Sequence, residues 1–173
     1  MPVRLNCAAL CLLVTSSGLA LAGGGPPPPR LAFLPLDRTY LGAGFTLRYP
    51  GDYSARPFVG GVALRRPGQE DALTATVLPR PGGARRLTPE AYARQFAPLN
   101  IQGAGAPLSL ARLTLSGGGS AWVGTWRGSR GTLGPLYLVP LDSGTQNWLV
   151  LSATTPADVP LLDAVARGVQ VRR

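Results

Sequence analysis

Three runs of aromatic and β-branched residues alternate with small or polar ones in the last third of the chain. They span residues 120–126, 133–139 and 146–152, and turn-forming residues separate them at 128–131 and 142–144. Short runs bounded by Gly, Ser and Asp are typical of antiparallel strands joined by tight turns. The pattern therefore predicts three neighbouring antiparallel strands in this part of the chain.

An amphipathic helix is predicted to follow these strands and to lie on the sheet. Thr155 is a suitable N-cap, Pro156 suits the first helical position, and Asp158 completes a capping box. Gly168 stands where a C-terminal cap is expected. The predicted buried face consists of Leu162, Val165, Ala166 and Val169, and residues 169–171 are predicted to add a closing strand.

Further strands are predicted in the first two thirds of the chain. Their ranges are 31–36, 45–49, 59–65, 72–78 and 108–115, and residues 66–71 are expected to join the third and fourth as a hairpin. The first of these runs is the weakest, whereas the second alternates cleanly between apolar and polar positions. Strands therefore outnumber helices along the chain.

A second helix is predicted to begin after Thr88, which is a good N-cap. Pro89 suits the first helical position and Glu90 suits the positive end of the helix dipole. Pro98 is expected to limit the helix to about three turns, because proline removes a backbone donor. The predicted apolar face consists of Tyr92, Phe96 and Leu99.

These elements together predict an α+β fold, a mostly antiparallel sheet with two helices packed on it. Short connections between successive strands favour antiparallel pairing, and helices must then cover the apolar face of the sheet. Trp122, Trp126 and Trp148 are predicted to fill the core between sheet and helix, since aromatic residues in strands are typically packing residues.

The first 22 residues have the pattern of a cleaved secretory signal. An apolar run is followed by Ala20 and Ala22, the small residues that signal peptidase requires, and cleavage is predicted before Gly23. We therefore expect an exported protein, located in the periplasm, in the cell envelope or outside the cell, with no transmembrane span in the mature chain.

A linker and a domain are expected to follow the signal. Residues 23–30 are rich in Gly and Pro and predict an extended linker, and residues 31–173 predict a single α+β domain. Both cysteines, Cys7 and Cys11, lie in the predicted signal. The mature domain is therefore expected to be stabilised by packing alone, without disulfides.

Residues 44–53 resemble the opening strand of the PsbP-like family, which is named for an extrinsic subunit of photosystem II. The matching positions are Phe45, Leu47, Tyr49, Pro50 and Tyr53, the last where the family usually has Trp. The later order of elements is also similar, including a helix opened by Thr88, Pro89 and Glu90 with Tyr92 behind them. The resemblance covers residues 31–171.

The resemblance implies a PsbP-like sandwich, an antiparallel sheet with helices packed on it, in an exported or lumenal protein. The family is mostly non-enzymatic and includes assembly factors, envelope proteins and a nuclear relative that binds a small GTPase. Its members share no catalytic residues, so the resemblance assigns none to this chain. It also assigns no role in photosynthesis, because fold does not imply function.

The charge of the chain is strongly positive, with a net charge of +9 from 17 basic residues that are all arginine. One interpretation is an anionic partner, and the other is the codon usage of a GC-rich genome. Arg80, Arg85, Arg86 and Arg94 lie close to Tyr92 in the sequence and form a candidate surface for anionic envelope components. Nucleic acid is not expected as a partner, because the protein is predicted to be exported.

The composition narrows the chemistry that the mature domain can perform. It has no histidine, no lysine and, after cleavage, no cysteine. These absences exclude nucleophiles activated by His, Schiff bases on Lys, and metal sites built from His or Cys. No catalytic residue, metal or cofactor is predicted. The eight acids are Asp37, Asp52, Glu70, Asp71, Glu90, Asp142, Asp158 and Asp163.

Three functional hypotheses remain open. The favoured one is an exported, non-catalytic binding or scaffolding module that contacts an envelope protein. The second is a carboxylate-based hydrolase of envelope glycans, which would need two acids facing each other in one cleft. The third is a binder of anionic envelope surfaces through its arginines.

Overall fold

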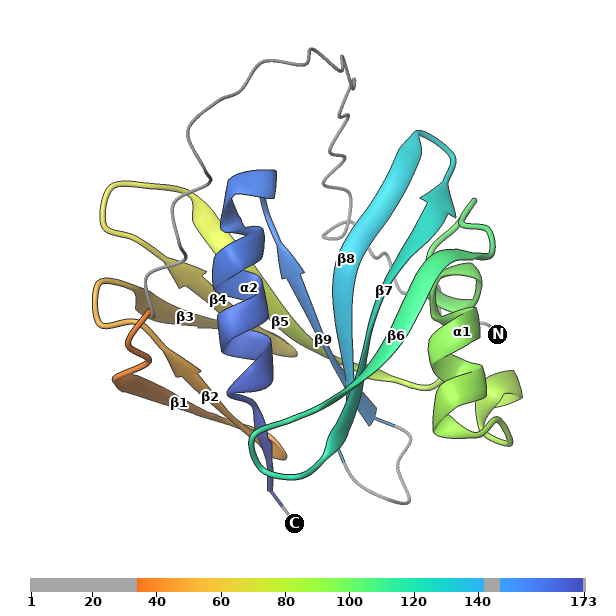
Figure 1. Ribbon diagram of the computed structural model, residues 1–173, viewed down its shortest axis with the longest axis horizontal. Helices are drawn as coiled ribbons and strands as arrows, with labels where there is room; N and C mark the ends of the chain where they lie inside the picture. Colours follow the sequence, from red (N-terminus) through yellow and green to blue (C-terminus); the bar gives the residue numbers. More distant parts are fainter. Residues whose placement is uncertain (1–33, 142–146, 173) are drawn as a thin grey trace, which may run out of the picture.

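The structure is a computed structural model that describes residues 34–141 and 147–172 (Figure 1). The predicted signal with Ala20, Ala22 and Gly23, the predicted linker and the predicted turn at 142–144 lie outside the described residues. The described part is an α+β fold in which every pair of neighbouring strands is antiparallel. The predicted fold class is confirmed at this level.

Seven strands form the main sheet in the order β3-β4-β5-β9-β8-β7-β6. They span β3 Ser54–Phe58, β4 Gly61–Arg65, β5 Asp71–Pro79, β6 Pro107–Thr114, β7 Ser120–Gly128, β8 Gly131–Pro140 and β9 Asn147–Ala153. The predicted hairpin between β4 and β5 is confirmed, and β9 pairs with β5 and β8 in the middle of the sheet.

A second, small sheet has the order β1-β2-β10. Its strands are β1 Arg38–Gly42, β2 Phe45–Tyr49 and β10 Gln170–Val171. The closing strand predicted at the end of the chain is therefore confirmed, and it pairs with β2 from the beginning of the domain. This pairing brings the two ends of the described chain together.

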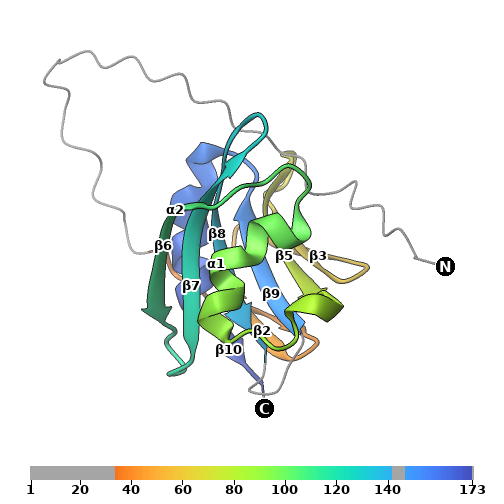
Figure 2. The same cartoon turned by 90° about the vertical axis from the view of Figure 1, so that its right-hand side faces the viewer.

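The two helices cover opposite faces of the main sheet (Figures 1 and 2). Helix α1, Pro89–Asn100, packs on one face, and α2, Val159–Arg167, packs with the small sheet on the other. Strand β9 contributes side chains to the hydrophobic core on each face of the sheet. Trp148 and Val150 face α1, while Leu149 and Leu151 face α2. A strand buried on both faces needs apolar residues at consecutive positions, as β9 has.

Helix α1 begins as predicted, with Thr88 as N-cap accepting a hydrogen bond from the Ala91 amide at 3.2 Å. Tyr92 and Phe96 are fully buried, but Leu99 is 38% exposed, so its predicted place on the buried face is wrong. The helix continues through Pro98 to Asn100. The buried residues of α1 are Tyr92, Ala93, Phe96 and Ala97, so Leu99 lies at the margin of the buried face and is partly exposed to solvent.

The start of the second helix differs from the prediction. Thr155 caps a short 3₁₀ turn, η2 Pro156–Asp158, and makes no side-chain capping bond. Its hydroxyl donates instead to the Asp158 carboxylate at 2.6 Å, because the 3₁₀ turn brings these two side chains together. The predicted capping box is therefore wrong. The predicted buried face and the cap at Gly168 are confirmed.

Three strand predictions need correction. Residues 34–37 are not a strand, and the first strand, Arg38–Gly42, lies further along because it pairs with β2 through a tight turn. Strand β3 is not among the predicted strands; it contains Pro57, and proline is tolerated there because β3 lies at the edge of the sheet. Val59 and Gly60 form the turn before β4 and do not belong to it.

Candidate binding surface

The four arginines near α1 divide into one that packs inward and three that face solvent. The Arg80 guanidinium lies over the rings of Tyr92 and Trp148, 4.9 and 5.4 Å from their centroids, and donates to the Leu87 carbonyl at 2.7 Å. Such stacking of a cation on aromatic faces stabilises the packing beneath it. Arg80 therefore covers the rings of two core residues under α1 and is not part of the exposed basic surface.

Tyr92 lies in this core and takes no part in the surface. Burial raises the pKa of Tyr92, although a hydrogen bond from Asn100 and the charge of Arg80 act in the opposite direction. The hydroxyl accepts from the Asn100 side-chain amide at 3.1 Å. The sequence-based interpretation of Tyr92 as a core residue is confirmed.

Arg85, Arg86 and Arg94 are exposed on the segment that leads into α1 and on the helix itself. The short 3₁₀ turn η1, Gly82–Ala84, precedes the first two, whose side chains have no hydrogen-bond or ion-pair partner in the described part of the chain. Arg94 lies 3.6 Å from Glu90 one turn earlier, with both side chains more than half exposed. Such exposed pairs contribute little to stability, so all three cations remain accessible to a ligand.

Further exposed arginines lie on β6, on β7 and in the turn that follows β7. Residues 91–141 contain four arginines and no acidic residue. Besides Arg94 they are Arg112 on β6, Arg127 on β7 and Arg130 in the following turn, and all are exposed. Arg112, Arg127 and Arg130 are not among the predicted binding residues, although the long interval without an acid is visible in the sequence.

A shallow groove opens between the end of α1 and the start of β6, with a volume of about 500 Å³. Arg94 is the one charged residue that lines it. The other lining residues are Gln95, Pro98, Gly105, Ala106 and Pro107. Backbone bonds fix its floor, since the Gly105 amide donates to Arg127 at 2.7 Å. The groove therefore places one arginine beside apolar surface, and no described acid lines it that could act in catalysis.

Apart from Glu90 on α1, the described acids lie elsewhere in the fold. Asp52 makes an exposed ion pair with Arg66 at 3.2 Å, and Asp158 accepts the bond from Thr155. Both carboxylates affect Tyr53. Burial is the largest effect and raises the pKa of Tyr53, the Arg66 charge lowers this pKa, and the charges of Asp52 and Asp158 raise it. The described residues contain no group of three acids that could hold a metal ion.

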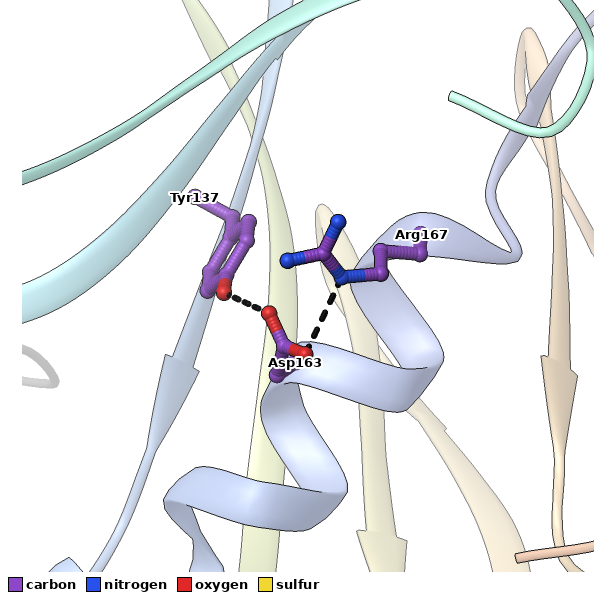
Figure 3. A network of polar contacts seen from close by, with 3 residues as sticks. All are labelled: Tyr137, Asp163 and Arg167. Atoms are coloured by element: carbon purple, nitrogen blue, oxygen red, sulfur yellow. Dashed lines mark hydrogen bonds and ion pairs between the residues drawn. The ribbon is translucent and has the colours of Figure 1, made fainter. Parts of the chain in front are cut away.

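Asp163 joins α2 to the main sheet (Figure 3). Its carboxylate accepts a short hydrogen bond from the Tyr137 hydroxyl on β8 and one from Arg167 Nε at 3.0 Å. Burial alone would raise the pKa of Asp163, but the bonds from Arg167 and Tyr137 and the Arg167 charge outweigh it, so this pKa is lowered. Burial, followed by the bond to Asp163, raises the pKa of Tyr137. The three residues form a brace between helix and sheet.

Replacing Asp163 by asparagine is expected to lower the free energy of unfolding by about 1 kcal/mol at pH 7, the usual size of a half-exposed charged hydrogen bond. Because the folded state lowers the pKa of Asp163, its stabilising effect is present at neutral pH and is lost as the carboxylate is protonated. The difference between the two proteins should therefore shrink below about pH 4.

Urea unfolding at several pH values measures this difference. Glu70→Gln is a suitable control, since Glu70 is exposed and makes no ion pair in the described structure. A difference for Asp163→Asn that stays constant from pH 7 to pH 3 would show that the charge of Asp163 contributes nothing.

No protein-family model and no curated protein matches this sequence. Among solved structures, the chain is similar to the solution structure of cyanobacterial PsbP (CyanoP) from Synechocystis sp. PCC 6803. The two are 13% identical, over 78% of this chain and 92% of that one, with a TM-score of 0.47. A crystal structure from Bacteroides thetaiotaomicron VPI-5482 is similar over 80% of this chain and 49% of its own, at 10% identity and a TM-score of 0.35.

Cyanobacterial PsbP is a protein of the kind that residues 44–53 resemble. A TM-score below 0.5 by itself assigns neither a function nor a partner to this chain. Within the two described ranges, neither helix has the length and apolarity that a membrane-spanning helix needs.

Proposed function

We propose that this chain is an exported, non-catalytic binding module that contacts a protein of the cell envelope through the basic surface around α1. The observation that carries the proposal is the exposure of the Arg85 and Arg86 side chains, which have no hydrogen-bond or ion-pair partner in the described structure, beside the acid-free stretch 91–141. Unpaired, exposed arginines suit recognition of carboxylate or phosphate groups, because their planar guanidinium donates two parallel hydrogen bonds.

Export is part of this proposal and rests on the pattern of residues 1–22. If the proposal holds, protein recovered from its own cells begins at Gly23 and is found outside the cytoplasm. Determination of the N-terminal residue of the recovered protein tests this directly. A chain that retains Met1 and stays in the cytoplasmic fraction would contradict export.

Replacing Arg85, Arg86 and Arg94 together by glutamine is expected to reduce the amount of envelope protein retained by the tagged chain at least tenfold. The reason is the loss of three accessible cations that pair with the partner. The measurement is retention from solubilised envelope, with identification of the retained protein. A matched control replaces the exposed Arg38 and Arg56, which lie on β1 and β3, by glutamine.

Equal losses in the two variants would show that net charge, not this surface, mediates binding. The fold of both variants is checked by their urea unfolding curves. Since all five residues are exposed, the substitutions should change the free energy of unfolding by less than about 0.5 kcal/mol each.

Binding of anionic lipid or glycan surfaces is a second candidate, because the same unpaired arginines would carry it. It predicts retention on phosphatidylglycerol vesicles at low salt that is lost at 1 M salt, where the screening length falls to about 3 Å. A partner protein retained at both salt concentrations favours the first candidate. Retention of vesicles alone, with no protein, favours the second.

Asp52 and Asp158 both raise the pKa of Tyr53, so the hydrolase hypothesis can be tested first with these two acids. Asp52 is already paired with Arg66, and Asp158 with Thr155. The groove beside α1 contains no acid. Turnover of envelope glycans that disappears in Asp52→Asn or Asp158→Asn would favour this hypothesis over a binding module.

A further inference from the structure

Strand β6 is one of the two edges of the main sheet, and it lies at the outer side of the molecule (Figure 2). It pairs with β7 alone, through a register in which Thr114 faces Ser120 and Arg112 faces Trp122. Five of its eight residues are exposed. This edge therefore borders solvent within the described structure.

The hydrogen-bonding pattern of β6 shows which backbone groups face outward. The Leu115 amide donates to the Gly119 carbonyl at 2.8 Å, directly after the Thr114–Ser120 pair in the same register. In an antiparallel pair, the residues that bond across the ladder alternate with residues whose N–H and C=O point away. Ala111 and Leu113 therefore bond to β7, whereas Leu110, Arg112 and Thr114 direct their backbone groups outward.

The opposite edge, β3, is blocked in ways that β6 is not. It has five residues, and Pro57 within it lacks a backbone donor. Proline and short length are common devices that prevent pairing with another chain. Strand β6 is longer, with eight residues, and its proline, Pro107, is its first residue, so the regular stretch from Leu110 to Thr114 contains no proline. An unpaired stretch with three outward N–H groups is suited to accept one more strand.

Charge selects the occupant of this edge. Arg112 lies in the middle of the open stretch, and Arg94 lines the groove at its start. No acid occurs between residues 91 and 141, and within the described structure these two arginines make one ion pair, the exposed contact of Arg94 with Glu90. A second copy of this chain paired in antiparallel fashion around Arg112 would bring two such positive edges together, which is unfavourable. An acidic strand would meet complementary charge instead.

We propose that the β6 edge binds an extended acidic segment of a partner protein, which adds an eighth strand to the main sheet. The Leu110, Arg112 and Thr114 backbone groups supply the main-chain bonds, and the arginine side chains select acidic residues at alternate positions. The exposed Leu108 and the groove wall at Pro98 and Pro107 contact an apolar residue beyond the acidic ones. The inference rests on the proposed function, since it names the partner class of a binding module.

The probe is a blocked heptapeptide that alternates glutamate and valine, added to the full chain. In the free protein, the amides of Leu110, Arg112 and Thr114 should exchange rapidly with solvent, whereas those of Ala111 and Leu113 should be protected. The peptide should slow exchange of the first three at least tenfold. The measurement is hydrogen exchange followed by NMR, with affinity from titration.

Two controls separate strand addition from attraction of charge. Thr114→Pro removes one outward N–H without changing the charge and should weaken binding at least tenfold, while Thr114→Ala should not. A peptide of the same charge with proline at its centre cannot complete the strand and should bind at least tenfold more weakly. Equal unfolding curves for the two Thr114 variants show that the fold is kept.

Three results would overturn the proposal. One is equal binding of the proline-containing peptide, and another is protection confined to residues of α1. The third is no peptide binding at all. If the envelope partner is still retained through Arg85 and Arg86 in that case, the proposed function stands and the strand addition alone fails.

Discussion

Replacing Trp148 by alanine is expected to lower the free energy of unfolding by about 3–5 kcal/mol, the typical cost of removing a buried aromatic side chain. Trp148 is fully buried on β9, in the middle of the main sheet. Its ring contacts Tyr92 at a centroid distance of 4.9 Å and Trp122 at 5.7 Å, and Arg80 stacks on it. The substitution leaves a cavity that α1 and the sheet cannot close without losing these contacts.

Urea unfolding measures this loss, and Leu108→Ala is the control, because Leu108 is 53% exposed on β6. A second variant, Trp148→Phe, separates volume from polarity. The Trp148 indole N–H is buried and has no partner among the described residues, so phenylalanine removes an unsatisfied donor as well as some volume. It should cost clearly less than alanine. If Trp148→Ala unfolds at the same urea concentration as Leu108→Ala, the core under α1 does not depend on this residue.

Replacing Gly61 by alanine is expected to cost about 3 kcal/mol, the upper range for inserting atoms into a packed site. A Cβ atom at Gly61 would lie 2.3 Å from the Ala75 carbonyl oxygen on β5 and 2.7 Å from the Phe58 ring. The carbonyl belongs to the paired strand, where Gly61 faces Thr76, and cannot move without breaking the ladder. The strands β4 and β5 must therefore separate locally.

Gly82→Ala is the matched control, because a Cβ atom there meets nothing within 4 Å. It should change the free energy of unfolding by less than about 0.5 kcal/mol. Thermal or urea unfolding of both variants gives the comparison. A Gly61→Ala protein as stable as Gly82→Ala would contradict the close packing of β4 against β5 at this position.

Local patterns predicted most of the elements for reasons that act within a few residues. Alternation along residues 120–126 and 133–139 placed two strands correctly, and Thr88 with Pro89 placed the start of α1. The failures have tertiary causes. Proline at position 57 is acceptable because β3 lies at an edge, and Leu99 is partly exposed because the buried face of α1 is made by Tyr92, Ala93, Phe96 and Ala97. Neither fact is encoded in the neighbouring residues.

The candidate surface shows the same division. The sequence indicated the arginines near α1, but it gave no means of separating Arg80, which stacks on two core rings, from Arg85 and Arg86, which face solvent. The brace from Asp163 to Tyr137 also joins residues 26 positions apart. Side chains acquire such partners only when strands and helices distant in the chain are packed together.

The sequence by itself determined the α+β class, the antiparallel pairing, the basic charge and the absence of histidine, because these follow from composition and short-range periodicity. The tertiary structure decided which strands lie at the edges and on which face each helix packs. It thereby decided that β6 is open while β3 is blocked. Strand order depends on how apolar faces distant in the sequence are buried together, so short-range patterns do not predict the strand order.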